Sequence, residues 1–113
     1  MSKYMQIDIR IIPFYEKSFE TRFPRISDLL KKTSFKNTSL RELSLYELVE
    51  YIVGLSRDQE TPSGTREKVK PFSSRLLELK NTAREHLLAR RLNELDKLLY
   101  KIEDQFEDLE DAL

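Results

Sequence analysis

The 113-residue sequence predicts a mainly α-helical protein, and three observations support this fold class. Only two glycines are present while 35% of the residues are charged, a composition that favours helices over sheets. Apolar residues recur at helical spacing over residues 45–55. From residue 88 onward they follow an unbroken heptad pattern. We expect one helical domain over residues 1–113, because neither half is large enough for its own core.

Residues 4–12 are the exception, because they predict a short strand. Apolar residues alternate there with polar ones at four positions, namely Met5, Ile7, Ile9 and Ile11. Pro13 would end the strand. A single strand is not stable alone, so it must pair with residues 19–23 or with another chain. The rest of residues 1–23 forms an aromatic lead-in that we expect to cover a helical core.

Two short helices are predicted within the helical region of residues 24–55. Pro24 is well placed for the first turn of a helix that ends near Lys32. The second helix ends near Leu55 and presents a broad apolar face. Two overlapping capping boxes precede it, Ser39 with Glu42 and Ser44 with Glu47.

Residues 56–64 are polar and contain Pro62 and Gly64, a composition typical of a loop. We expect one long helix within residues 65–113 that begins at Thr65 or at Lys70, where Pro71 would fit its first turn, because no later glycine or proline interrupts it. At about 1.5 Å per residue this helix would extend on the order of 60 Å. A compact domain of this size is narrower, so part of the helix must project or dimerise.

A heptad seam over residues 88–113 is the strongest pattern in the sequence. Its members alternate in spacing between four and three residues, as the a and d positions of a left-handed coiled coil do: Leu88, Leu92, Leu95, Leu99, Ile102, Phe106, Leu109 and Leu113. So narrow a stripe must meet another helix, from this chain or a second one. We therefore expect these residues to form an oligomer or partner interface, and the protein not to be monomeric. An earlier stripe over residues 72–87 is offset from the seam near residues 86–88 and is expected to pack on residues 45–55.

Six acidic residues between Glu103 and Asp111 have no basic neighbour among them. They oppose the helix dipole at a C-terminus and repel one another. We expect these turns to be ordered only when docked on an antiparallel neighbour, beside residues 80–91, or on a separate basic partner.

No catalytic, metal or cofactor site is predicted. The chain has no cysteine, and its single histidine, His86, has no identifiable triad or metal partner. Net charge is zero, and acids interleave the basic residues that could contact nucleic acid or an acidic partner, Arg84, Arg90, Arg91 and Lys97. Tight nucleic-acid binding is therefore not expected. Because no signal peptide or membrane-spanning run is found, we expect a cytoplasmic location without membrane contact.

Two stretches resemble the helical domain of GINS subunits, the tetrameric scaffold of the archaeal and eukaryotic replicative helicase. One is residues 43–53, a leucine followed by a short turn, an aromatic residue and a helix. The other is residues 79–91, which is similar to the Asn-Ala-Arg…Leu…Arg helix of that family, and a polar loop separates the two stretches in both cases. The resemblance implies non-enzymatic assembly with replication proteins.

These patterns leave three hypotheses, none of them an enzyme. The first is a helical interaction or scaffold protein, GINS-like in its role, which binds protein partners through its C-terminal helix in a homo- or hetero-oligomer. The second is a self-associating coiled-coil adaptor or small regulator. The third, ranked last, is a nucleic-acid-binding protein.

Overall fold

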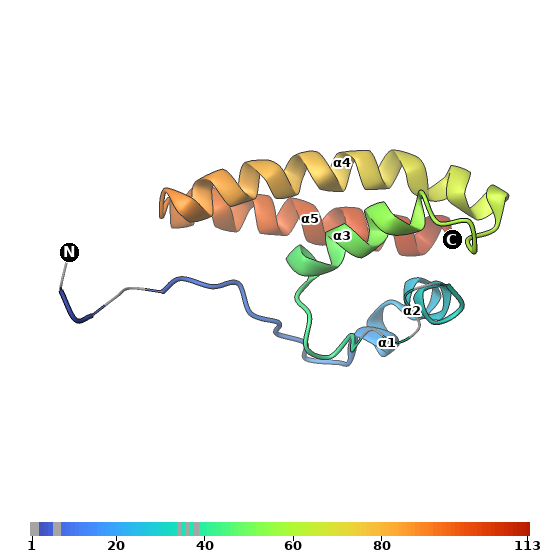
Figure 1. Cartoon of the computed structure of the whole chain (residues 1–113), viewed down its shortest axis with the longest axis horizontal. Helices are drawn as coiled ribbons and strands as arrows, with labels where there is room; N and C mark the ends of the chain where they lie inside the picture. Colours follow the sequence, from blue (N-terminus) through green and yellow to red (C-terminus); the bar gives the residue numbers. More distant parts are fainter. Residues whose placement is uncertain (1–2, 6–7, 34, 36, 38) are drawn as a thin grey trace.

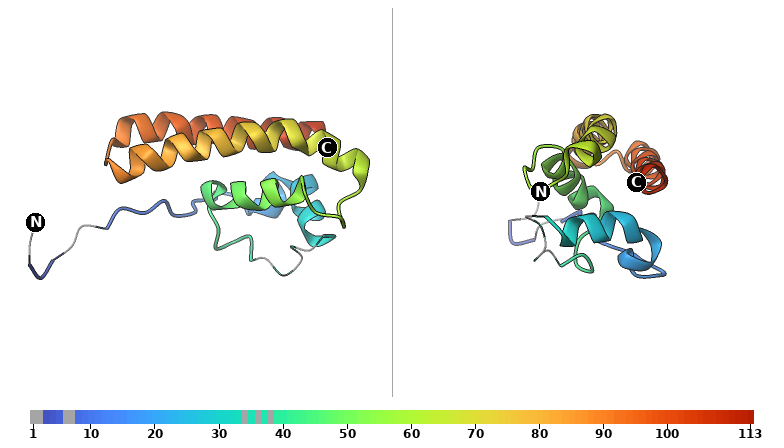
Figure 2. Two further views of the ribbon diagram at one scale, coloured as in Figure 1. Left: turned by 45° about the horizontal axis from the view of Figure 1, so that its top comes forward. Right: turned by 90° about the vertical axis from the view of Figure 1, so that its right-hand side faces the viewer.

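The computed structural model describes residues 3–5, 8–33, 35, 37 and 39–113, and the described residues form five helices and no strand. The prediction of a mainly α-helical fold is confirmed. The helices are α1 (Phe19–Arg22), α2 (Pro24–Lys31), α3 (Leu45–Leu55), α4 (Ser63–Leu88) and α5 (Leu92–Ala112). Helices α4 and α5 form a long antiparallel hairpin, with α3 packed along α4 (Figure 1). Helices α1 and α2 cover the C-terminal end of α5 (Figure 2).

The prediction of one uninterrupted helix over residues 65–113 is wrong, because the chain reverses direction at residues 89–91. The Arg91 N–H donates to the carbonyl of His86 at 2.9 Å, and the Arg90 N–H donates to that of Leu87 at 3.1 Å. This pair of bonds is a Schellman motif, which ends α4. Arg90 has φ = 56°, the left-handed conformation that glycine usually provides at this position. The break lies next to the expected offset between the two apolar stripes.

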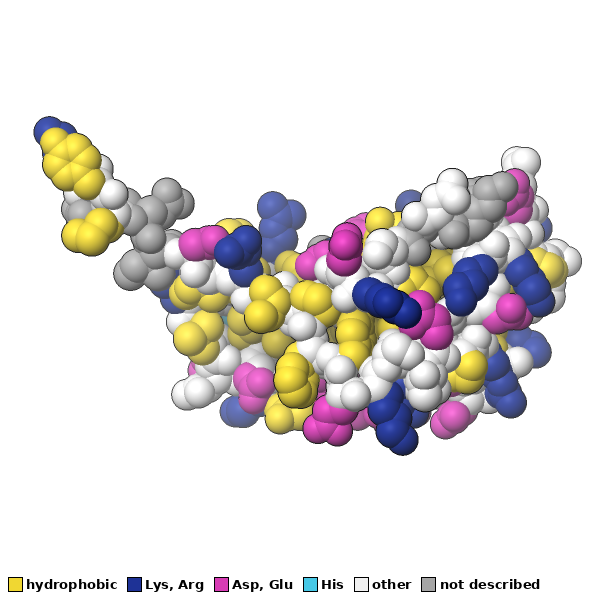
Figure 3. Space-filling view, turned by 90° about the horizontal axis from the view of Figure 1, so that it is seen from below, with side chains coloured by type: hydrophobic (Ala, Val, Ile, Leu, Met, Phe, Trp, Pro, Cys, Tyr) yellow, Lys and Arg dark blue, Asp and Glu magenta, His cyan; other side chains and the backbone are white. Residues whose placement is uncertain are grey.

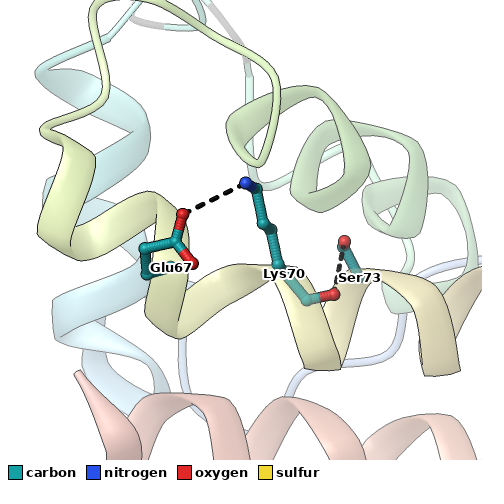
Figure 4. Close-up of polar contacts among 3 residues, drawn as sticks. All are labelled: Glu67, Lys70 and Ser73. Carbon is teal, nitrogen blue, oxygen red and sulfur yellow. Dashed lines mark hydrogen bonds and ion pairs between the residues drawn. The ribbon is translucent and has the colours of Figure 1, made fainter.

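Helix α4 begins at Ser63, so Pro71 lies inside it rather than in its first turn. Proline has no N–H to donate to the carbonyl of Glu67, and the turns before it lean away from the axis of the remainder (Figure 1). One side-chain contact lies just before this point and a second spans it (Figure 4). The Lys70 ammonium lies 3.1 Å from the Glu67 carboxylate, and the Ser73 hydroxyl donates to the Lys70 carbonyl at 2.9 Å. The helix therefore continues through the proline.

The expected N-terminal strand is not formed among the described residues, and Gln6 and Ile7 lie outside them. Residues 8–17, which we call the N-terminal arm, run without helix or strand beside the helices (Figures 1 and 2). The suggested pairing with residues 19–23 does not occur, because residues 19–22 form α1. Without a neighbouring strand the arm has no ladder to join.

Capping explains why α3 begins where it does. The Ser44 hydroxyl accepts a hydrogen bond from the Glu47 N–H at 3.2 Å, as the second capping box predicts. Ser39 and Glu42 form only a turn, in which the Glu42 N–H donates to the Ser39 carbonyl at 3.3 Å. Helix α3 then buries its apolar face at the centre of the molecule, through Leu48, Val49, Ile52, Val53 and Leu55.

The acidic C-terminus is docked within the chain, but not beside residues 80–91. Glu110, only 8% exposed, accepts hydrogen bonds from the Arg25 N–H at 2.9 and 3.1 Å and from the Ile26 N–H at 3.0 Å. Phe23 at the N-cap of α2 provides no side-chain cap, so the carboxylate of Glu110 supplies one from α5. Glu107 pairs with Arg22 at 2.8 Å. The basic partner of the acidic end is therefore the α1–α2 region.

Candidate interaction surface

The eight seam residues divide into a buried and an exposed set. Leu95, Ile102, Phe106 and Leu109 lie in the core, at most 5% exposed, because α5 packs against the other helices of its own chain. Leu99 and Leu113 are half-buried. Leu88 and Leu92 flank the hairpin turn and remain 70% and 53% exposed. This end of the seam is its most exposed part.

An open groove of about 780 Å³ lies between the N-terminal arm, the start of α3 and the middle of α5. Apolar side chains line much of it, from Ile11 and Phe14 on the arm to Tyr100 and Ile102 on α5. Ile12, Phe14 and Tyr100 are 72%, 84% and 61% exposed. Hydrophobic side chains gather on this face near the base of the arm (Figure 3). Exposed aromatic and aliphatic side chains of this density are typical of protein-binding surfaces.

Charged residues of both signs line the groove, the acidic Glu16, Glu103 and Glu107 and the basic Lys17 and Arg22. Burial raises the pKa of Glu103, and the neighbouring carboxylates of Glu107, Asp104 and Asp96 raise it further. On the opposite wall, burial raises the pKa of Tyr15 to about 12, with contributions from Glu47 and Glu20.

Tyr15 fixes the base of the arm to the body of the protein. Its hydroxyl donates to the Leu43 carbonyl at 2.6 Å, and its ring meets that of Phe19 edge to face, with centroids 6.1 Å apart. Ile11 also packs against the core. The wall of the groove formed by the arm is therefore anchored at two positions.

The four basic residues singled out in the sequence lie at one end of the hairpin, around the turn. Arg84, Arg90, Arg91 and Lys97 are all exposed, and so are the acidic residues between them, Glu85, Glu94 and Asp96. The Arg91 Nε–H donates to Nδ1 of His86 at 2.8 Å, which gives the single histidine a partner within the turn. This mixed-sign surface provides no continuous phosphate-binding stripe.

Sequence reasoning missed Ile12, Phe14 and Tyr100 as surface residues. Tyr100 falls between the seam positions Leu99 and Ile102, so its exposure follows from the heptad phase. Among the described residues no group of three His, Cys, Asp or Glu side chains could hold a metal ion. Nor is any described helix both long and apolar enough to cross a membrane.

No protein-family model, curated protein or solved structure matches this chain.

Proposed function

We propose that this chain is a non-enzymatic helical interaction protein, which acts as a scaffold for protein partners in the cytoplasm. The observation that carries the proposal is the set of large apolar side chains left exposed along the hairpin and the groove, Leu88, Leu92, Tyr100, Ile12 and Phe14. These side chains contribute no hydrophobic free energy while they are exposed to water. A partner that fully covered one of them would stabilise the complex by about 1.5–3 kcal/mol for each aliphatic or aromatic side chain. A partner that covers several of them accounts for their presence.

Within this class we propose a GINS-like role in a DNA replication complex. The two stretches that resemble that family, residues 43–53 and 79–91, fall on α3 and on the end of α4. These two helices pack against each other. The support is the resemblance of these two segments and the contact between the helices that carry them, and the partners implied are other replication proteins.

Self-association is the second candidate, because Leu88 and Leu92 continue the heptad pattern at the uncovered end of the seam. A hairpin whose tip meets a second tip would bury both residues. In either case the protein partner binds at the C-terminal helical hairpin. Nucleic-acid binding at Arg84, Arg90, Arg91 and Lys97 ranks third and is expected to be weak and salt-sensitive.

Affinity purification from the native organism, followed by mass spectrometry, tests the proposal. The wild type is compared with Leu92→Asp, which places a charge on the exposed seam, and with Asn93→Asp, which adds the same charge at a neighbouring exposed polar position. We expect partners to be lost with Leu92→Asp and retained with Asn93→Asp. Replication proteins among them would support the GINS-like role, and the chain's own copies alone would support self-association. Partners unaffected by Leu92→Asp would contradict binding at the exposed end of the hairpin, and the absence of any partner would contradict the proposed function.

A further inference from the structure

The turn at residues 89–91 is held by the packing of α4 on α5 rather than by local sequence preference. Residues 87–92 are Leu, Leu, Ala, Arg, Arg and Leu, all of them strong helix formers. They include no glycine, proline or asparagine that would favour a turn. Arg90 nevertheless adopts φ = 56°, where the Cβ of an L-residue crowds the backbone. Opening the turn would release this strain.

Two uncovered apolar side chains flank the same turn. Leu88 is the last residue of α4 and Leu92 is the first of α5, and they are 70% and 53% exposed. From Leu95 onward the seam is covered by helices of its own chain. One end of the hairpin therefore combines backbone strain with exposed apolar surface (Figure 1).

The contacts that hold α5 in place lie far from the turn. The ring of Phe106 meets that of Phe23 edge to face, with centroids 6.0 Å apart, and Glu110 accepts hydrogen bonds from the N–H groups of Arg25 and Ile26. The docking site for α5 is formed by α2, α3 and α4. The α5 helix of a second copy could make the same contacts, so exchanging α5 between two copies loses none of them.

Opening the turn breaks only its own hydrogen bonds. They are the two backbone bonds that end α4, from Arg91 to His86 and from Arg90 to Leu87, and the side-chain bond from Arg91 Nε to His86 Nδ1. The turn is exposed, so water can replace these bonds at small net cost.

Two copies that meet at their turns bring an exchange within reach of the chain. From Leu88 to Leu92 an extended chain spans up to about 13 Å, whereas packed helices lie about 8–10 Å apart. Residues 89–91 can therefore run from α4 of one copy to the α5 docking site of the other. A continuous helix would not serve, because the apolar stripes of α4 and α5 are offset near residues 86–88 and would face different sides. Where the two chains cross, Leu88 and Leu92 of both copies would cover one another.

We propose that two copies of this chain exchange α5 across a hinge at residues 89–91, so that the α5 of each copy packs on α3 and α4 of the other. This inference rests on self-association, the second candidate above, and names the segment that is exchanged. Short hinges under strain favour such an exchange. Because only the hinge region differs between the two forms, the closed hairpin is the main form below roughly 100 µM and the exchanged dimer forms above it. The dimer forms and dissociates slowly, since α5 must first leave its own docking site.

Spin labels on separate copies test the exchange. One sample carries Lys68→Cys and the other Asp108→Cys, both at exposed positions toward the end of the hairpin away from the turn. The two are mixed at about 1 mM, and the dimer is isolated by size exclusion. In the exchanged dimer a label on α4 of one copy lies beside a label on α5 of the other, so we expect an interchain distance well below 52 Å. In a dimer that meets at the turns without exchange, each label lies about 30 Å from the turn, and the two are separated by about 60 Å.

Arg90→Gly tests whether strain drives the exchange. Glycine adopts φ = 56° freely, so the association constant of the dimer should fall at least about tenfold. Arg90→Lys keeps both the strain and the charge. Ala89→Gly places the glycine at φ = −86°, where it relieves no strain. Both controls should dimerise within about threefold of the wild type, as measured by sedimentation velocity of the full chain after the same incubation.

Three results would overturn the proposal. The first is a wild type that stays monomeric at about 1 mM, even after refolding at that concentration. The second is a dimer that shows only the long interchain distance, which would refute the exchange but support self-association at the turns. The third is Arg90→Gly dimerising as tightly as the wild type.

Discussion

Replacing Glu110 with alanine is expected to uncouple α2 from the end of α5. The carboxylate accepts three backbone hydrogen bonds of 2.9–3.1 Å from Arg25 and Ile26, and the residue is only 8% exposed. Losing a side-chain cap costs about 0.5–2 kcal/mol, and losing an anion at a partly buried helix N-terminus costs up to about 2 kcal/mol more. We therefore expect the free energy of unfolding to fall by about 2–4 kcal/mol. For a chain of this length, that lowers the melting temperature by roughly 8–15 °C.

Urea denaturation followed by circular dichroism measures the loss, and Glu107→Ala is the matched control. Glu107 makes its ion pair with Arg22 at a half-exposed site, so its removal should cost less than about 1 kcal/mol. Glu110→Gln keeps the shape and one acceptor but removes the charge, and it should fall between the two. Equal losses for Glu110→Ala and Glu107→Ala would refute the capping role of Glu110.

Three further substitutions test separate contacts. Gly54→Ala places a Cβ 2.5 Å from Cζ of Phe35 and should lower the free energy of unfolding by about 1 kcal/mol. In a Phe35→Ala background the same change should raise it by up to about 1 kcal/mol, because alanine has the higher helix propensity. A double-mutant cycle measured by urea denaturation gives both values. Arg90→Gly should raise the urea midpoint by the equivalent of about 0.5–1 kcal/mol, because glycine adopts φ = 56° without strain; an unchanged midpoint would contradict this. The raised pKa of Glu103 means that its protonated form favours folding at low pH and that this contribution is lost as pH rises through the raised pKa. Glu103→Gln should therefore stabilise by a few tenths of a kcal/mol at pH 7 and make no difference below about pH 4, as urea midpoints at the two pH values would show.

Local signals in the sequence predicted much of the helical structure. The Ser44 capping box marked the start of α3, and Pro24 marked the start of α2, because both act within one turn of the chain. The reversal at residues 89–91 was missed because Arg90 occupies a position where glycine would have given the signal. Leu88 and Leu92 lie four residues apart on either side of the turn, so the heptad spacing runs unbroken across it.

Long-range contacts explain the other differences. The partners of Glu110 are backbone N–H groups about 85 residues away in the sequence, and no side-chain pattern encodes a backbone donor. The seam correctly indicated apolar burial at Leu95 and Phe106, but not whether the covering helix came from the same chain. Which side chains border the groove depends on the path of the N-terminal arm beside the helices. The alternation of apolar and polar residues in the sequence does not determine that path.

The heptad seam is used mainly within one chain, through the α4–α5 hairpin. Spin labels at Lys68→Cys and Asp108→Cys test it directly, because the natural sequence has no cysteine and both positions are exposed. With the labelled chain diluted in unlabelled protein, pulsed electron resonance reports the distance within one molecule. The hairpin places both labels at the same end, so we predict a distance well below the 52 Å length of the molecule. A continuous helix that dimerised through the seam would separate them by about 60 Å, and that result would show that the seam is used between chains.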